Sequence, residues 1–413
     1  MLGALRERRF RLLWLGQSTS ALGDALVPVA LAFAVLGLPG GSASDLGLVF
    51  AAQVLPLVTF ILVGGVWADR LPRQIVMLTS DAVRGAVHAT IAALLLTGAA
   101  QLWHLIALIA VYGAAEAFFR PAQSGLTPST VSPERLQQAN ALLGFSASSA
   151  NVLGPAVAGV IVAFGSAGLA FAIDAGTFAV SAVSLSLLRV APAARAASES
   201  FLHELRLGWR DFTSRTWLWV EVAWATVFIF LALAPYLVLG PVVAKQSLGG
   251  AGAWAAILTG FGVGELAGGV LALRWKPERP LLAISALTLL TTPTFALLAL
   301  RAPVALIVAA QLGAGLSMGF YGAVWTTTMQ QHVPPDRISR VSAYDWLGSL
   351  AFLPLGFALA GPVSGAIGVS TTLWIGAGVT VVSTFAVLAV RDVRELRRAD
   401  EAPAPAATMA ADA

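Results

Sequence analysis

Long apolar runs separated by short polar segments constrain this chain more than any other feature. About 20 mostly apolar residues span a bilayer as a helix, because a helix satisfies its own backbone hydrogen bonds where water is absent. Of the 413 residues, 58% are hydrophobic and only 11% are charged, whereas a soluble protein is about a quarter charged. The runs are too long and too uniform for barrel strands. We therefore expect an all-α polytopic membrane protein.

The apolar runs predict twelve membrane spans, arranged as two halves of six. The predicted spans are 11–36, 45–68, 75–97, 102–120, 139–164, 168–188, 217–243, 252–273, 281–300, 303–328, 341–362 and 370–390. We expect an N-terminal half over 1–190, a cytoplasmic linker over 191–215, a C-terminal half over 216–392 and a disordered cytoplasmic tail over 393–413. The external loops are too short to hold a further domain.

Basic residues are distributed with a strong bias between the two sets of connecting loops. Nearly all of the 25 Lys and Arg lie in one set of alternate loops and at the termini. Only Lys245 and Arg301 fall in the other set, and Arg84 falls inside a span. Loops rich in Lys and Arg remain in the cytoplasm. The bias therefore predicts a multi-pass protein of the cell (inner) membrane with both termini in the cytoplasm, and the positive charge does not indicate a nucleic-acid partner.

An internal repeat relates the two halves. Residues 64–70 read Gly-Gly-Val-Trp-Ala-Asp-Arg, and residues 268–274 read Gly-Gly-Val-Leu-Ala-Leu-Arg. Segments 131–136 and 153–159 are matched at nearly the same offset by 333–338 and 355–361. Two parallel repeats in a membrane protein commonly enclose a substrate site near the bilayer midplane, so the duplication favours a transporter.

The loop after the second span resembles the Gly-x-x-x-Asp-Arg/Lys-x-Gly-Arg-Arg/Lys motif of the major facilitator superfamily. Gly65, Asp69, Arg70 and Arg73 match, whereas Pro72 replaces a glycine and Gln74 a basic residue. In that family the loop controls gating and favours the outward-open state. Glycine permits close helix packing, and a carboxylate is favourable at the N-terminus of a facing helix. The second copy has Leu273 in place of Asp69, so the motif implies one acidic gating loop.

The fifth span contains Gly154, Pro155 and Gly159, and resembles the Gly-Pro motif of exporters in the same superfamily. Proline removes one helical hydrogen bond and glycine permits close packing. Further segments resemble the drug-exporter branch that includes macrolide and enterobactin-type exporters: 11–17, 23–24, 81–84, 119–122 and 173–178. The resemblance covers the first half and weakens in the second. It implies export of bulky amphipathic molecules, driven by the proton gradient.

Ionisable side chains inside a membrane are costly and are therefore candidates for function. Asp24, near the middle of the first span, is the first candidate for proton coupling; the alternative is a hydrogen-bonded helix contact. The other candidates are Glu116, Glu221, Glu265 and Asp345. Asp81 and Arg84 are spaced i, i+3 near the cytoplasmic end of the third span, which predicts a structural ion pair. We expect Asp174 to be a gate or packing contact, and His88 and His104 to lie near span ends without a role.

Aromatic, amide and thioether side chains predict the wall of a substrate cavity. In the superfamily that the chain resembles, spans one, four, seven and ten line this cavity. Such side chains suit loose binding of amphipathic molecules and allow cation–π contacts, although any one of them could instead face lipid. The expected cavity residues are Gln17, Tyr112, Trp224, Phe228, Gln311, Met318, Tyr321 and Trp325.

The sequence lacks the Gly-x-x-x-x-Gly-Lys-Ser/Thr loop of ATP-driven transport and has no cysteine. We therefore predict a secondary transporter, not an enzyme, that works without cofactor or metal as a monomer. Its partners would be a small-molecule substrate, protons and the lipid bilayer. Two alternatives are an importer or facilitator of a small metabolite with the same fold, and a non-transporting membrane sensor.

Overall fold

The computed structural model describes residues 3–188, 201–334 and 337–399, and the side chains within these ranges except those of 61–70, 201–205 and 339. The regular elements of this part are all helical, which confirms the all-α prediction. The helices of the first half are α1 (Arg8–Asp24), α2 (Val27–Gly37), α3 (Ala43–Arg70), α4 (Arg73–Leu96), α5 (Leu102–Leu126), α6 (Leu136–Phe164) and α7 (Ala167–Ser186).

The later helices are α8 (Phe201–Thr213), α9 (Thr216–Phe228), α10 (Ala234–Val243), α11 (Ala251–Arg274), α12 (Pro280–Thr288), α13 (Thr292–Ala299), α14 (Val304–His332), α15 (Ile338–Leu350), α16 (Leu353–Ile367), α17 (Val369–Ala389) and α18 (Arg391–Arg394). Eleven helical segments of the described part are long and apolar enough to cross a membrane. The third predicted span, α4, is not among them; it carries buried Asp81, Arg84 and His88, and it packs against α5 and α7.

Four of the predicted spans are each made of two helices. The breaks separate α1 from α2, α9 from α10, α12 from α13, and α15 from α16. In each case a proline is the second residue of the later helix: Pro28, Pro235, Pro293 and Pro354. Proline lacks the N–H that would bond the carbonyl four residues earlier, and its ring crowds that carbonyl. The proline positions therefore explain where these spans bend or change helix type.

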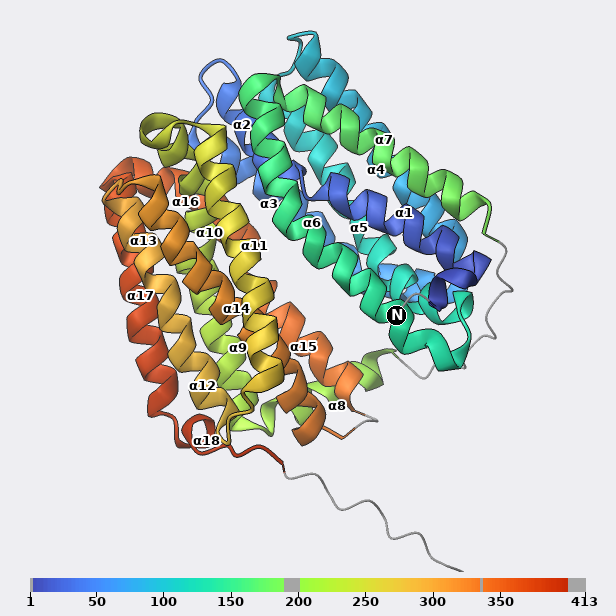
Figure 1. Cartoon of the computed structure of the whole chain (residues 1–413). Coiled ribbons are helices and arrows are strands. Elements are labelled where there is room, and N and C mark those ends of the chain that lie inside the picture. The colour runs from blue at the N-terminus through green and yellow to red at the C-terminus, as the bar shows by residue number, and fades with distance from the viewer. Residues whose placement is uncertain (1–2, 189–200, 335–336, 400–413) are drawn as a thin grey trace, which may run out of the picture.

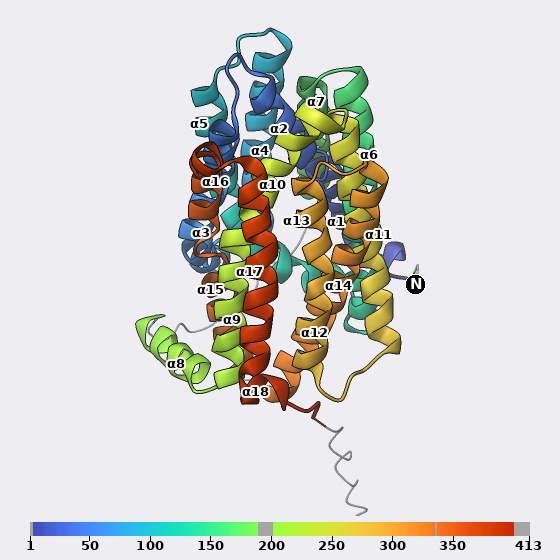
Figure 2. The same cartoon turned by 90° about the vertical axis from the view of Figure 1, so that its left-hand side faces the viewer.

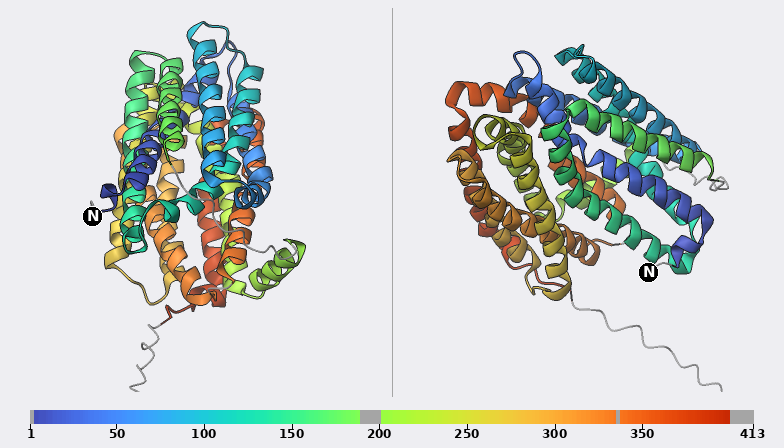
Figure 3. Two further views of the ribbon diagram at one scale, coloured as in Figure 1. Left: turned by 90° about the vertical axis from the view of Figure 1, so that its right-hand side faces the viewer. Right: turned by 45° about the horizontal axis from the view of Figure 1, so that its top comes forward.

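Helices α1–α7 form one group and α9–α17 a second, which we call the N-bundle and the C-bundle (Figure 1). The start of α1 lies at the end of the N-bundle away from α2, and helices α8 and α18 lie at the lower end of the C-bundle in Figure 1, called here the terminal end. Helix α8 lies beside the C-bundle at that end (Figure 2) and packs against α9 and α15. The right view of Figure 3 also shows the two bundles apart, whereas in the left view the N-bundle lies in front of the C-bundle.

Most of the described contacts between the bundles form two seams away from the terminal end, and α2 adds contacts with α10 and α11. In the first, α3 packs on α16: a Cβ on Gly47 would lie 2.1 Å from the carbonyl oxygen of Phe357. In the second, α6 packs on α11: a Cβ on Gly159 would lie 2.3 Å from the Cβ of Ala255. Small residues allow this approach, so the bundles are in close contact at the end opposite the termini.

Candidate functional site

Asp24 is the last residue of α1 and lies directly before the break in the first span. Because Pro28 has no N–H, the carbonyl of Asp24 lacks its usual helical partner. The Asp24 carboxylate accepts a 2.7 Å hydrogen bond from the hydroxyl of Tyr112 on α5, and a weaker one of 3.5 Å from Ser20. Its side chain keeps 34% of its surface exposed. Asp24 is thus anchored by a phenol yet still accessible.

Arg84 on α4 is buried and connects two carboxylates. Its guanidinium donates a hydrogen bond to Asp81 on the same helix, and it lies 3.8 Å from the carboxylate of Asp24. The second oxygen of Asp81 accepts a 2.6 Å bond from Ser181 on α7. The Arg84 guanidinium also lies 4.0 Å from the ring centre of Phe119, within the range of a cation–π contact. The predicted ion pair is present, and it extends to Asp24.

Gln17 on α1 belongs to the same network. Its side-chain oxygen accepts a 2.6 Å hydrogen bond from Gln123 on α5, and its amide donates to Ser181 at 3.3 Å. Gln17 is buried. This residue therefore joins α1, α5 and α7, and its polar atoms already have protein partners.

His88 lies inside the N-bundle, so the prediction that it is near a span end is wrong. It is the sixteenth residue of the 24-residue helix α4 and is fully buried. Its Nδ1 lies 2.5 Å from Oδ2 of Asp174 on α7, which is also fully buried. His104, by contrast, is at the start of α5, where its ring bonds the backbone N–H of Gln101. Residues 81, 84 and 88 share one helical face, a spacing that could have revealed His88.

Glu116 on α5 is largely buried but does not lack a counter-ion. Arg120, one turn later on the same helix, donates hydrogen bonds of 2.9 Å and 2.5 Å to its Oε1. The Glu116 side chain is 13% exposed. Its charge is thus balanced locally, whereas Asp24 has only a more distant arginine.

The C-bundle contributes a column of aromatic rings between α9 and α14. Phe228 stacks on Trp224 with ring centres 5.5 Å apart, Trp224 lies 6.0 Å from Tyr321, and Tyr321 lies 6.0 Å from Trp325. The Trp325 indole donates a 3.0 Å hydrogen bond to Asp345 on α15. The four predicted cavity aromatics therefore lie together and are joined to one of the candidate acids.

The remaining predicted residues of the C-bundle are distributed around this column. Glu221 is buried, and its Oε1 accepts a 3.2 Å bond from Ser285 while its Oε2 has no partner among the described residues. Gln311 is buried between Tyr236, to which it donates at 2.8 Å, and Thr294, from which it accepts at 2.9 Å. Met318 on α14 and Glu265 on α11 are both partly buried.

The predicted gating loop connects α3 to α4. The side chains of Gly65, Asp69 and Arg70 lie outside the described residues. Arg73 donates a 2.8 Å hydrogen bond to the carbonyl of Gly125 at the end of α5. Arg73 therefore links the start of α4 to the adjacent helix in the N-bundle.

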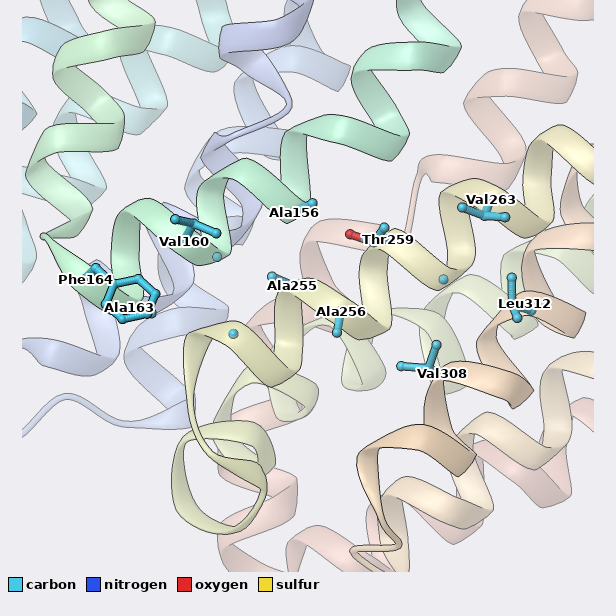
Figure 4. A pocket seen from close by; sticks show the side chains of 13 residues that line it. Ala156, Val160, Ala163, Phe164, Ala255, Ala256, Thr259, Val263, Val308 and Leu312 are labelled. Carbon is cyan, nitrogen blue, oxygen red and sulfur yellow. The ribbon is translucent and has the colours of Figure 1, made fainter.

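The exporter-type motif of α6 makes close contacts on both sides of the helix. Gly154 packs against Ala25, at the break in the first span, and Gly159 packs against Ala255 across the seam. Pro155 is buried between them. Beside the seam lies an apolar groove of about 520 Å³, lined by α6, α11 and α14 (Figure 4). Thr259 carries the one hydroxyl among its lining residues. The motif thus touches both the kink next to Asp24 and the opposite bundle.

Among the described side chains, no three His, Asp or Glu residues are grouped as metal ligands would be. Sequence reasoning missed the connection of Gln123 to Gln17 and the pairing of His88 with Asp174. It also assigned no role to Lys245, which donates a hydrogen bond across the bundles to the carbonyl of Leu36.

Comparisons with known proteins bear on the family and the fold of this chain. A family model described as Major Facilitator Superfamily matches residues 13–349. The chain is 23% identical over 401 residues to macrolide efflux protein A of Streptococcus pyogenes, covering 95% of this chain and 97% of that protein. It is 28% identical over 382 residues to the multidrug efflux pump Tap of Mycolicibacterium fortuitum, covering 86% and 88%.

Solved structures with the same fold are more distant in sequence. The nucleoside transporter NupG superposes with a TM-score of 0.69 at 16% identity, covering 92% of this chain and 98% of that one. A bacterial homologue of the iron transporter ferroportin, in an inward-facing state, superposes with a TM-score of 0.72 at 16% identity, covering 92% and 98%. At this level of identity the likeness concerns the fold alone.

Proposed function

Because this chain belongs to the Major Facilitator Superfamily and to its drug-exporter branch, we propose that it exports amphipathic small molecules in exchange for protons. The observation that carries the proposal is the environment of Asp24. The Asp24 side chain is a carboxylate at a break in a membrane helix. It is anchored by Tyr112 and 34% exposed. Its nearest cation, Arg84, is 3.8 Å away and already bonded to Asp81.

Two opposing effects act on Asp24 in this arrangement. The charged carboxylate is favoured by the Tyr112 hydroxyl and by Arg84, and the protonated acid avoids placing a charge at membrane depth. The accessible side chain lets a proton enter and leave. Glu116, Glu221, Glu265 and Asp345 are secondary candidates for a coupled proton.

The aromatic column of the C-bundle supports an amphipathic substrate. Trp224, Phe228 and Trp325 are buried in this structure, and their ring faces would suit flat or cationic molecules once the bundles move apart. In the N-bundle, Gln17 and Tyr112 would contact a substrate only by exchanging their present partners, among them Gln123 and Asp24. Relatives named as macrolide and multidrug efflux proteins support export as the direction.

Transport would proceed by alternating access between the two halves, 1–190 and 216–392, joined by the linker 191–215. The seams at α3–α16 and α6–α11 hold the bundles together at one end, and we infer that access to the substrate site is from the terminal end. We place this end in the cytoplasm of the cell membrane, with the protein acting as a monomer. The gating loop with Asp69, Arg70 and Arg73 would secure the terminal end when it closes.

The test is dye accumulation in an efflux-deficient bacterial host that expresses the protein. Cells with the wild-type chain should retain less rhodamine 6G than control cells, and an uncoupler should abolish the difference. Asp24→Asn should lose this uncoupler-sensitive export, because the amide cannot exchange a proton. Asp392→Asn, on exposed α18 outside the spans, is the matched control and should export normally.

Full proton-driven export by Asp24→Asn would refute the role of Asp24. Uptake of dye that is indifferent to the uncoupler would instead indicate a facilitator.

A further inference from the structure

We propose that His88 and Asp174 are positioning residues for proton exchange at Asp24, and that they act through Tyr112. The inference rests on the proposed proton antiport. It concerns two fully buried polar side chains for which the export mechanism above has no use. Four elements contribute to the arrangement, namely α7, α4, α5 and α1.

The first link is the pair formed by Asp174 and His88. Nδ1 of His88 lies 2.5 Å from Oδ2 of Asp174, and Thr177 donates a 2.9 Å hydrogen bond to the other carboxylate oxygen. Asp174 also lies directly against α1, because a Cβ on Gly23 would be 2.0 Å from its Oδ1. The His88 ring is therefore held in one orientation by a carboxylate that is itself fixed on both sides.

The second link is the contact between His88 and Tyr112. The two rings are stacked, with centres 4.6 Å apart and planes only 7° from parallel. Phe171 meets the His88 ring edge-on at 5.0 Å. A stacked neighbour that cannot rotate limits the rotation of Tyr112, which places its hydroxyl 2.7 Å from Oδ1 of Asp24.

This orientation matters because a hydrogen bond donated to a carboxylate favours its charged form. The titratable side chains that act on Asp24 are Arg84 of α4, Tyr112 and Glu116 of α5 and, behind Gly23, Asp174 of α7. The sequences of α2 and α6 contain no titratable side chain. Of these groups, Tyr112 is the one within hydrogen-bond distance of Asp24. If His88 is replaced, the phenol is free to turn away, and Asp24 should release its proton only at higher pH.

The experiment measures proton release from purified, detergent-solubilised protein when rhodamine 6G is added to a weakly buffered solution, as a function of pH. Tyr112→Phe removes the donor and should move the midpoint of release to higher pH by roughly one unit. His88→Gln keeps an amide that can bond Asp174 but loses the stacked ring, and it should move the midpoint in the same direction. The double variant His88→Gln/Tyr112→Phe should match Tyr112→Phe alone.

This non-additivity separates a positioning role from a merely structural one, because independent effects would sum. His104→Gln, at the start of α5, is the matched control and should leave the midpoint unchanged. Asp174→Asn provides a second variant that should shift the midpoint as His88→Gln does. Thermal unfolding of each variant shows that it is folded when the release is measured.

The outcomes are distinguishable. A wild-type midpoint in both His88→Gln and Asp174→Asn, or strictly additive shifts in the double variant, would overturn the positioning role while the antiport remains. If Asp24→Asn releases protons like the wild type, the proposed site of exchange is wrong, and the positioning role is rejected with it.

Discussion

Gly154 of α6 lies against Ala25, the residue that follows Asp24 at the break of the first span. A Cβ on Gly154 would be 2.3 Å from the Cβ of Ala25 and 2.8 Å from its carbonyl oxygen. Real Cβ atoms essentially never approach non-bonded atoms this closely, so a side chain at 154 would displace the kink. The exporter-type motif is thus in direct contact with the backbone that positions Asp24.

Replacing Gly154 by alanine should therefore reduce both stability and export. Forcing a methyl group into a closely packed interior costs about 1–3 kcal/mol, and the displacement would fall on the residue next to Asp24. Thermal unfolding in detergent and uncoupler-sensitive dye export measure the two effects. The matched control is Gly144→Ala on the same helix, where a Cβ would meet nothing within 4 Å. Equal behaviour of the two variants would show that the contact with Ala25 is unimportant.

Substitutions in the aromatic column should weaken the binding of an amphipathic substrate. Trp224→Leu and Trp325→Leu each remove a ring face and should weaken rhodamine 6G binding about tenfold, the scale of one stacking or cation–π contact. Fluorescence anisotropy of the dye with purified protein measures the dissociation constant. Trp374→Leu, on α17 and 47% exposed, is the control that should bind normally. An equal loss in all three variants would argue for a nonspecific effect.

The contact between Lys245 and Leu36 should stabilise the state in which the seams are closed. The Lys245 ammonium group bonds the carbonyl of Leu36 at the C-terminal end of α2, where the helix dipole favours a cation. Lys245→Met should destabilise the state in which the seams are closed by about 0.5–1 kcal/mol. The population in which the seams have separated should therefore increase about two- to five-fold. The natural chain has no cysteine, so a single Ser44→Cys substitution can be labelled selectively with a maleimide. Ser44 lies against Gly361 in the α3–α16 seam, and the labelling rate therefore measures how often this seam opens.

The same label tests the specificity of this effect. Arg301 is the other basic residue in the set of loops that contains Lys245. Arg301→Met should not alter the labelling rate of Ser44→Cys. A rate unaffected by Lys245→Met would contradict a closing role for this contact.

Features that depend only on residues close together in the chain could be predicted from the sequence. Apolar runs of membrane length predict helices because the bilayer leaves few other ways to satisfy the backbone. The i, i+3 spacing of Asp81 and Arg84 predicts their pairing, since residues three apart are neighbours on a helix. A proline alone does not predict where a span is interrupted: Pro28 follows a break, whereas Pro56 and Pro155 lie inside unbroken helices.

Contacts between distant segments were decided only by the tertiary structure. Asp24 and Tyr112 are 88 positions apart, and His88 and Asp174 are 86 apart; no periodicity in one helix indicates which side chain of another it will meet. Glu116 is paired with Arg120 one turn away on the same helix, which is a local contact, whereas the accessibility of Asp24 depends on how the helices pack. The sequence by itself determined the spans and the residue types available for chemistry. The packing of α1, α4, α5 and α7 determined which of those residues lie together, because hydrogen bonding depends on distances that a linear pattern does not contain.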